Sequence, residues 1–447
     1  MKNRNLTEGS ILKNLMLFSL PMMAGNFLQQ IYNIADMIIV GRFIGSDALA
    51  AVGSAYTLMI FLTSLIIGLC MGSGALFSKS FGAGNTDEMR QDIRLSFGFI
   101  GCVTFVIYLL VFPGTDVILH LLAIPDTVYD MMRSYIVVIF IGIVFVFFYN
   151  FFAYFLRAIG NSVVPLYFLA ISSVMNIVLD LYFVISLKWG VVGAATATVI
   201  SQAFSGIGIF IYVWIKAGSY LRLGEPLRWK RLGEIIRNDV FTGLQQSVMN
   251  FGILMIQGLV NSFGAVVMAA FAAAVKIDTL AYMPAQEFGN AYSLFISQNY
   301  GAQKRERIKK GTKLATCVSV VFCVVVSGFI FLTAKGPMKL FVDSTETSII
   351  EAGVKYLRIE GSFYFGIGIL FLLYGYFRGI QRAEVSLVLT IISLGTRVVL
   401  SYLLAPNTAL GVQAIWWSIP IGWILADIVG IILQKAEIKN GKKSYNS

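Results

Sequence analysis

Charged residues are scarce in this sequence. Asp, Glu, Lys and Arg make up 13% of its 447 residues, whereas hydrophobic residues make up 57%. With a mean hydropathy of +0.79, a soluble protein of this length could not hide its apolar surface from water. Water-soluble fold classes are therefore excluded, and the sequence predicts a polytopic integral membrane protein.

Residues that build reaction centres are also few. There is one histidine, His120, and the four cysteines show no spacing with His or Cys that suggests a metal. No nucleophile with a partner base is recognisable, so an enzyme is not predicted. We expect the cysteines to be packed structural thiols and the protein to need no cofactor. The net charge of +11 does not imply nucleic acid, since basic loops would face anionic membrane lipid.

Long apolar stretches are what the sequence has instead. Twelve of them reach about 20 residues or more, the length needed to cross about 30 Å of hydrocarbon. Their approximate limits are 14–40, 48–73, 93–113, 130–155, 163–186, 191–216, 240–261, 266–297, 312–333, 353–376, 384–405 and 410–434. The first is too long for a signal peptide and lacks a cleavage site, so we expect it to remain as a helix.

The basic residues indicate how these spans are oriented. Most of the 34 Lys and Arg residues fall near the termini or in the loops that follow even-numbered spans. Because short basic loops stay in the cytoplasm, both termini are predicted to be cytoplasmic.

An internal repeat divides the chain into two halves. A shift of 219 residues aligns Gly45 with Gly264, and a shift of 221 aligns Tyr135 with Tyr356. Each half holds six spans, an even number, so both halves enter the membrane in the same direction. The predicted fold is all-α, with two six-helix bundles related by a pseudo-two-fold axis along the membrane normal. The bundles are 1–216 and 240–447, joined by a cytoplasmic linker at 217–239.

Two carboxylates lie within the apolar stretches, Asp36 near the outer end of the first and Asp180 in the fifth. Each costs roughly 2.5–3.5 kcal/mol on insertion scales, which favours a functional role. Gln29 and Asn33 share a helix face with Asp36, and Asn176 lies one turn before Asp180. Such oxygens suit a proton or a small cation. The alternative is that each acid only caps its own helix end near water.

Several short motifs extend this pattern along the chain. Asp36 opens the stretch Asp-Met-Ile-Ile-Val-Gly-Arg-Phe-Ile-Gly, fifteen residues after Pro21. The remaining motifs are Phe81-Gly-Ala-Gly, Gln298-Asn-Tyr-Gly-Ala-Gln, Asn176-Ile-Val-Leu-Asp180 and Gly193-Ala-Ala-Thr-Ala-Thr198. Over essentially its whole length the chain resembles the multidrug and toxic compound extrusion (MATE) family, in its prokaryotic DinF-like branch.

The resemblance implies a cation or proton site in the N-terminal lobe. Matched residue by residue, it comprises Asp36, Asn176, Asp180 and Thr198, where Na⁺ is the possible metal. Thr196 competes with Thr198 for the last role.

Other branches carry a C-terminal site, with a glutamate on the seventh helix and an aspartate on the tenth. This chain has no acid between Val240 and Asn261, and Glu360 is the one acid of the tenth span, so that site is not expected here.

Further polar residues are candidates for a substrate cavity. On the seventh span, Asn250 and Gln257 share a face, and either a wet cavity or hydrogen bonding in a dry helix interface would explain them. On the eighth, Lys276 and Glu287 are functional candidates by their depth. An ion pair of Lys276 with Asp278 or with another helix is an equal alternative. The tentative cavity set is Gln29, Asn33, Asn250, Gln257, Lys276 and Glu287.

These features predict a monomeric, secondary-active efflux antiporter of the plasma membrane. It would export small amphipathic compounds, cationic or aromatic, in exchange for H⁺ or Na⁺. Neutralisation of Asp36 and Asp180 would favour closure, and Pro21 offers the first helix a place to bend. The alternative function is a flippase for lipid-linked saccharide or another lipid precursor. Its polyanionic headgroups would call for more basic residues within the spans than Lys276 and Arg397.

Overall fold

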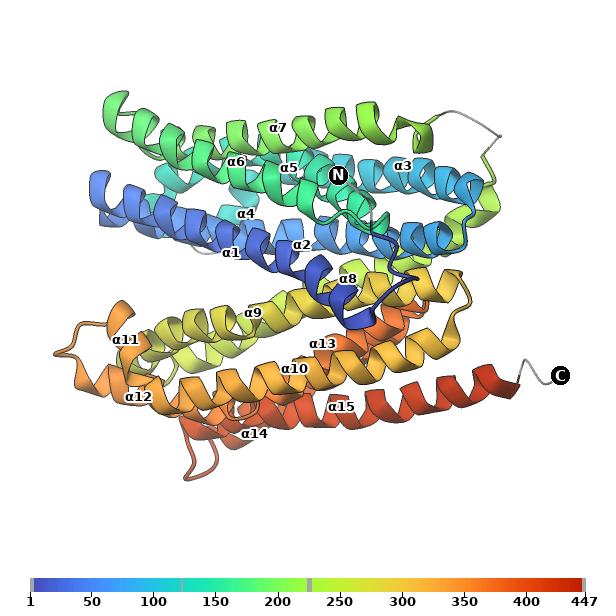
Figure 1. Cartoon of the computed structure of the whole chain (residues 1–447). Coiled ribbons are helices and arrows are strands. Elements are labelled where there is room, and N and C mark those ends of the chain that lie inside the picture. The colour runs from blue at the N-terminus through green and yellow to red at the C-terminus, as the bar shows by residue number, and fades with distance from the viewer. Residues whose placement is uncertain (1–3, 122–123, 223–226, 444–447) are drawn as a thin grey trace. The chain divides into compact units, whose positions relative to one another are not determined.

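The computed structural model describes residues 4–121, 124–222 and 227–443, without the side chains of 121, 253–254 and 440–443. All regular elements in this part of the chain are helices (Figure 1). The first half contains α1 Ile11–Phe43, α2 Ser46–Gly82, α3 Thr86–Val111, α4 Thr115–Leu121, α5 Asp126–Ala158, α6 Val163–Asp180, the π-helix η1 Leu181–Ser186, α7 Gly190–Ala217 and the 3₁₀ turn η2 Gly218–Tyr220. The second contains the 3₁₀ turn η3 Trp229–Arg231, α8 Leu232–Asn261, α9 Ala265–Gly301, α10 Arg305–Thr333, α11 Lys335–Phe341, α12 Thr347–Gly361, α13 Tyr364–Gly379, α14 Ala383–Leu404 and α15 Val412–Lys443.

Every predicted span coincides with helix, and the all-helical prediction is confirmed. In the described residues, ten helices are long and apolar enough to cross a membrane, or eleven if the bent pair α12 and α13 counts as one span. That pair fills the tenth predicted span, 353–376, and turns through 52° at its break. The short helices α4 and α11 were not predicted, because each is only 7 residues long.

The repeat is visible in the backbone itself. Four pairs of equivalent residues share a positive φ, the left-handed region that non-glycine residues rarely adopt. They are Gly45 with Gly264, Gly84 with Gln303, Gly160 with Gln381, and Gly190 with Gly411. Each pair lies at the turn between the same two helices of its half. The two halves therefore share turn geometry even where their residues differ.

The chain forms two compact units. Unit 1 comprises Met1–Glu8 and Met16–Ser247, and unit 2 comprises Gly9–Leu15 and Val248–Ser447. In unit 1, α5 packs between α2 and α7, and Phe97 of α3 contacts four phenylalanine rings of α5 at 5.2–6.0 Å. In unit 2, α9 packs on α13 and α14 on α15.

The units do not divide at the predicted linker, 217–239, of which residues 223–226 lie outside the described part. The first half of α8 belongs to unit 1. A Cβ on Gly68 of α2 would lie 2.6 Å from the Gly243 Cα, and one on Gly72 would lie 2.8 Å from the Asp239 Cα. Small residues that let helix backbones approach are the usual means of packing helices in membranes.

Polar bonds accompany this close approach of α2 and α8. The Ser73 hydroxyl donates to Asp239 Oδ2 at 2.6 Å, and Asn238 Nδ2 donates to the Gly72 carbonyl at 2.7 Å. Asp239 is fully buried. The start of α8 is thus an integral part of the amino-terminal unit and not a free connection.

Candidate functional site: a buried acidic layer in unit 1

The two predicted acids of the first half lie close together. Asp36 is on α1, and Asp180 is the last residue of α6, directly before the π-helix. The charge of Asp36 acts on Asp180, which has no exposed surface, while Asp36 is half-buried. A π-turn inserts an extra residue into a helical turn and often marks a functional position. The structure therefore brings together two carboxylates that are far apart in the sequence.

Asn176 and Thr198 complete the predicted set. Asn176 is buried, and its side-chain Nδ2 donates to the Thr198 hydroxyl at 3.3 Å, joining α6 to α7. The competitor Thr196 donates its hydroxyl to the Val192 carbonyl of its own helix at 2.7 Å. Because Asn176 bonds to Thr198 and not to Thr196, the geometry favours Thr198 as the fourth member.

Oxygen atoms without hydrogen-bond donors gather in this layer. Asp36 Oδ1, Asn176 Oδ1 and both carboxylate oxygens of Asp180 are buried and accept no hydrogen bond. Buried polar atoms normally find a partner, and leaving one unsatisfied costs about 1–3 kcal/mol, more when it is charged. Acceptors of this kind fit a proton or a hard cation, whose preferred ligands are oxygens.

Tyrosines around the acids were not predicted from the sequence. Tyr135 of α5 is buried near both Asp36 and Asp180. Tyr56 of α2 accepts a hydrogen bond from Asn33 Nδ2 at 3.0 Å. Asn33, one turn before Asp36, thereby links α1 to α2. Aromatic residues are common in apolar spans, and nothing in their spacing distinguishes these two from packing residues.

The remaining cavity candidates are scattered. Gln29 and Lys276 are exposed, and Asn250 is half-buried. Gln257 Nε2 donates to Asn261 Oδ1 on its own helix at 2.9 Å. The proposed ion pair of Lys276 with Asp278 does not form in the described residues, because Asp278 turns into the interior of unit 2 while Lys276 turns outward.

Glu287 has a defined local role. It is largely buried and accepts a hydrogen bond from Asn290 Nδ2 at 3.1 Å. Asn290 Oδ1 in turn accepts from Arg378 Nη2 at 3.2 Å, so Glu287 belongs to a polar chain between α9 and α13. Pro21 lies inside α1, which continues through it.

A second acidic cluster in unit 2 was missed by the sequence reasoning. Asp278 of α9 and Glu360 of α12 are buried and interact with each other and with Arg397 of α14. The hydroxyl of Tyr364 is buried beside Asp278. The signal that could have found it is the presence of charged residues of both signs among three apolar spans.

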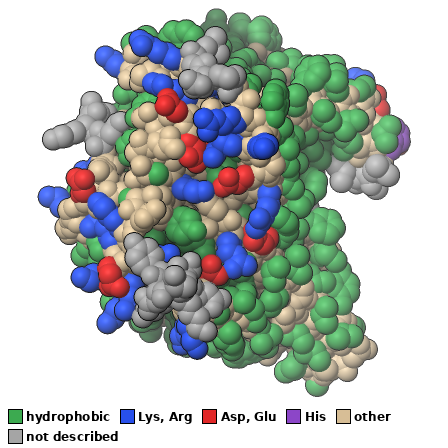
Figure 2. Space-filling model, turned by 90° about the vertical axis from the view of Figure 1, so that its right-hand side faces the viewer, with side chains coloured by type: hydrophobic (Ala, Val, Ile, Leu, Met, Phe, Trp, Pro, Cys, Tyr) green, Lys and Arg blue, Asp and Glu red, His purple; other side chains and the backbone are tan. Residues whose placement is uncertain are grey.

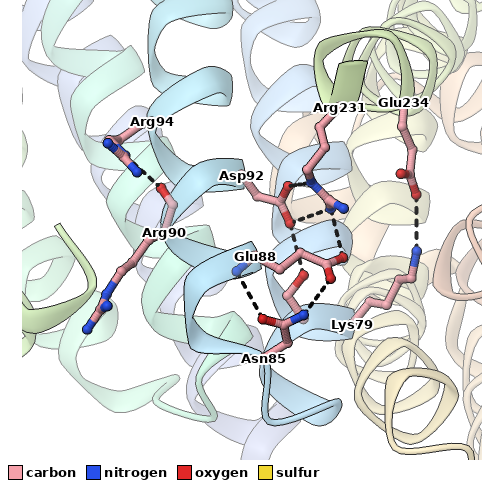
Figure 3. A network of polar contacts seen from close by, with 9 residues as sticks. Lys79, Asn85, Glu88, Arg90, Asp92, Arg94, Arg231 and Glu234 are labelled. Carbon is pink, nitrogen blue, oxygen red and sulfur yellow. Dashed lines mark hydrogen bonds and ion pairs between the residues drawn. The ribbon is translucent and has the colours of Figure 1, made fainter. Parts of the chain in front are cut away.

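Charged side chains gather on one face of the molecule, with hydrophobic side chains along its flanks (Figure 2). In unit 1, Arg231 of η3 joins the start of α8 to α3 (Figure 3). Its Nε donates to Asp92 Oδ1 at 2.8 Å, and its Nη2 lies 2.9 Å from Glu88 Oε1. Asp92 is fully buried and also accepts from the Ser80 hydroxyl at 2.9 Å.

This network gives a stability prediction. Arg231→Ala leaves the buried Asp92 without its countercharge and should lower the free energy of unfolding by about 3 kcal/mol. Thermal unfolding of the purified protein in detergent measures the loss. The matched control is Lys79→Ala, because the Lys79–Glu234 pair is more exposed and should contribute less than about 1 kcal/mol. A larger loss in the control than in Arg231→Ala would contradict this assignment.

Together, the fold and the site define a membrane transporter built from two repeated helical halves. The MatE family model matches the chain twice, over residues 21–182 and 241–403, once in each half. The chain therefore belongs to the MATE family.

Individual relatives agree with this assignment. A probable multidrug resistance protein, YpnP of Bacillus subtilis, is 31% identical over 402 residues, 88% of each chain. The probable multidrug resistance protein NorM of Thermotoga maritima is 27% identical, over 94% of this chain and 90% of its own length. A solved structure described as the outward-facing conformation of a multidrug resistance MATE family transporter superposes with a TM-score of 0.92, at 26% identity over 98% of both chains.

Proposed function

We propose that this protein is a secondary-active antiporter that exports small amphipathic compounds in exchange for H⁺ or Na⁺. The observation that carries the proposal is the layer of unpartnered oxygens on Asp36, Asn176 and Asp180. Four buried acceptor atoms that receive no hydrogen bond make a site whose stability depends on what neutralises it. The multidrug names of the relatives support the same class of substrate.

Coupling follows from charge. A ligand shifts a conformational equilibrium only through different affinities for the two states. With Asp36 and Asp180 ionised, the layer favours a conformation that admits water or cations. With Asp36 and Asp180 neutralised by a proton or a cation, the layer tolerates a closed conformation from which water is excluded.

The helix that carries Asp36 is suited to respond. α1 contacts α6 and α2 through side chains: a Cβ on Gly25 would lie 3.3 Å from Leu169 Cδ2, and Asn33 Nδ2 donates to the Tyr56 hydroxyl. Pro21 removes one backbone donor within α1, and kinks in helices usually occur at such positions. A change of charge at Asp36 can therefore alter the course of α1 at Pro21.

Substrate breadth has a compositional basis. Phe and Met side chains on lining surfaces adapt to varied apolar shapes. A polyanionic lipid precursor would require several basic side chains within the spans. Of the two basic residues within the predicted spans, Lys276 and Arg397, the second lies beside the acids Asp278 and Glu360. This arrangement disfavours the flippase alternative. We further propose a monomer in the plasma membrane with both termini in the cytoplasm.

Vesicles test this proposal. The purified protein is reconstituted into liposomes, proton and sodium gradients are imposed separately, and the movement of a fluorescent cationic dye is followed. Dye movement under either gradient, with return flux of that ion, is the expected result. Lipid-linked saccharide flipping in the same vesicles, without gradient-dependent dye transport, would favour the alternative.

A further inference from the structure

The chain ahead of α1 is docked on unit 1. The Arg4 backbone N–H donates to the Gly160 carbonyl at 3.1 Å, in the turn between α5 and α6. Leu6 has no exposed surface, and Thr7 is buried. Asn5 Oδ1 accepts from the Thr7 backbone N–H at 3.0 Å and from its hydroxyl at 2.8 Å, closing a local turn. Terminal residues are usually poorly ordered unless they are tied down in this way.

The internal repeat shows why residue 160 is a glycine. Gly160 has φ +84°, but its counterpart Gln381 adopts φ +64°, so this turn accepts a side chain in the left-handed conformation. What differs is the space available. A Cβ on Gly160 would overlap the carbonyl oxygen of Arg4. The glycine therefore serves the close approach of the amino-terminal segment and not the backbone angle alone.

A second pair of equivalent residues supports this reading. Gly84, in the α2–α3 turn, has φ +70°, and its counterpart Gln303 has φ +57°. A Cβ on Gly84 would meet nothing within 4 Å. The two glycines thus share a conformation and a glutamine counterpart, and they differ in whether another part of the chain lies against them.

We propose that residues 4–8 are an anchor that ties the segment just ahead of α1 to the turn just ahead of α6, both of which belong to unit 1. Thr7 is four residues before Ile11, the first residue of α1, which limits their separation to about 14 Å. On the other side of the contact, Asn161 Oδ1 accepts from the Val164 backbone N–H at 3.2 Å in the first turn of α6. The segment that leads into α1, which carries Asp36, and the turn that leads into α6, which carries Asp180, therefore meet within unit 1.

The anchor positions one acid against the other. If the segment ahead of α1 is held, bending within α1 displaces Asp36 relative to Asp180. If it is released, α1 can shift as a whole, and the same bending moves Asp36 less. This positioning role rests on the proposed antiport, whereas the docking itself does not.

Thiol labelling tests the docking. Leu6→Cys is introduced into a background in which the exposed cysteines, Cys102 and Cys317, are alanine. The rate of maleimide labelling is then measured in detergent with and without Gly160→Gln. We expect slow labelling with Gly160 and a rate at least about tenfold higher with Gly160→Gln, because labelling follows the undocked population. Gly84→Gln, the matched control, should leave the rate unchanged.

A milder variant guards against misfolding. Asn5→Ala removes the two hydrogen bonds that Asn5 Oδ1 accepts from Thr7. Because the Asn5 side chain is exposed, this change leaves no cavity, and it should also raise the labelling rate. Equal rates for the parent, Gly160→Gln and Asn5→Ala would overturn the anchor. In vesicles, Gly160→Gln and Asn5→Ala should raise the ion concentration needed for half-maximal dye transport, while Gly84→Gln does not. Faster labelling with unchanged ion dependence would refute the positioning role, and absence of dye transport by the parent would instead refute the antiport.

Discussion

Asp180→Asn is expected to reduce gradient-driven dye transport about 5- to 150-fold, the range that corresponds to coupling free energies of 1–3 kcal/mol. The amide keeps the size of the carboxylate but can neither take up a proton nor balance a cation. Asp36→Asn should act in the same direction. The measurement is initial transport rate in vesicles under the gradient that drives the parent.

Stability distinguishes this effect from misfolding. Asp180 is buried with neither carboxylate oxygen hydrogen-bonded, so the amide removes an uncompensated charge and should leave the unfolding temperature equal or higher. The matched control is Asp116→Asn on α4, an exposed acid that pairs with Arg133 at 2.6 Å. The transport rate of Asp116→Asn should equal that of the parent protein. Full transport by both Asp36→Asn and Asp180→Asn would remove them from the coupling site.

Arg397→Met is expected to lower the free energy of unfolding by about 3–5 kcal/mol, the usual result of breaking a buried charge cluster by removing one partner. Arg397 is the positive charge that acts on both Asp278 and Glu360. Without it, the two buried acids face each other uncompensated. Thermal unfolding in detergent reports the change.

Two further variants sharpen the test of this cluster. Glu360→Gln combined with Arg397→Met removes one charge of each sign and should recover most of the lost stability. Lys276→Met, an exposed lysine on the same helix as Asp278, should stay within about 0.5 kcal/mol of the parent. If Arg397→Met and Lys276→Met changed the free energy of unfolding by the same amount, Arg397 would not be the countercharge of Asp278 and Glu360.

The spans and the repeat could be predicted because both follow from local features of the sequence. Apolar length determines which segments cross a membrane, and turn residues such as Gly45 and Gly264 recur at a constant offset. The proximity of Asp36 and Asp180 could also be predicted, since a carboxylate in an apolar span requires a partner or a function.

Other features depend on contacts that no local pattern encodes. The break between α12 and α13 falls within one continuous apolar stretch, so length and hydropathy predict a single span. The packing of α8 on α2 depends on Gly68 and Gly72 meeting a helix far away in the sequence. The cluster of Asp278, Glu360 and Arg397 needs three helices placed side by side before its charges can be seen to balance.

The sharing of α8 bears on how such a gene could have arisen by duplication. An ancestral polypeptide equivalent to residues 1–222 would leave the small-residue surface around Gly68 and Gly72 bare, because the helix that covers it begins at Leu232. A second copy would have to supply that helix. A paired ancestor, in which one copy covered this surface with the start of its leading helix, satisfies this requirement before fusion and explains why the first half packs against residues beyond its own repeat.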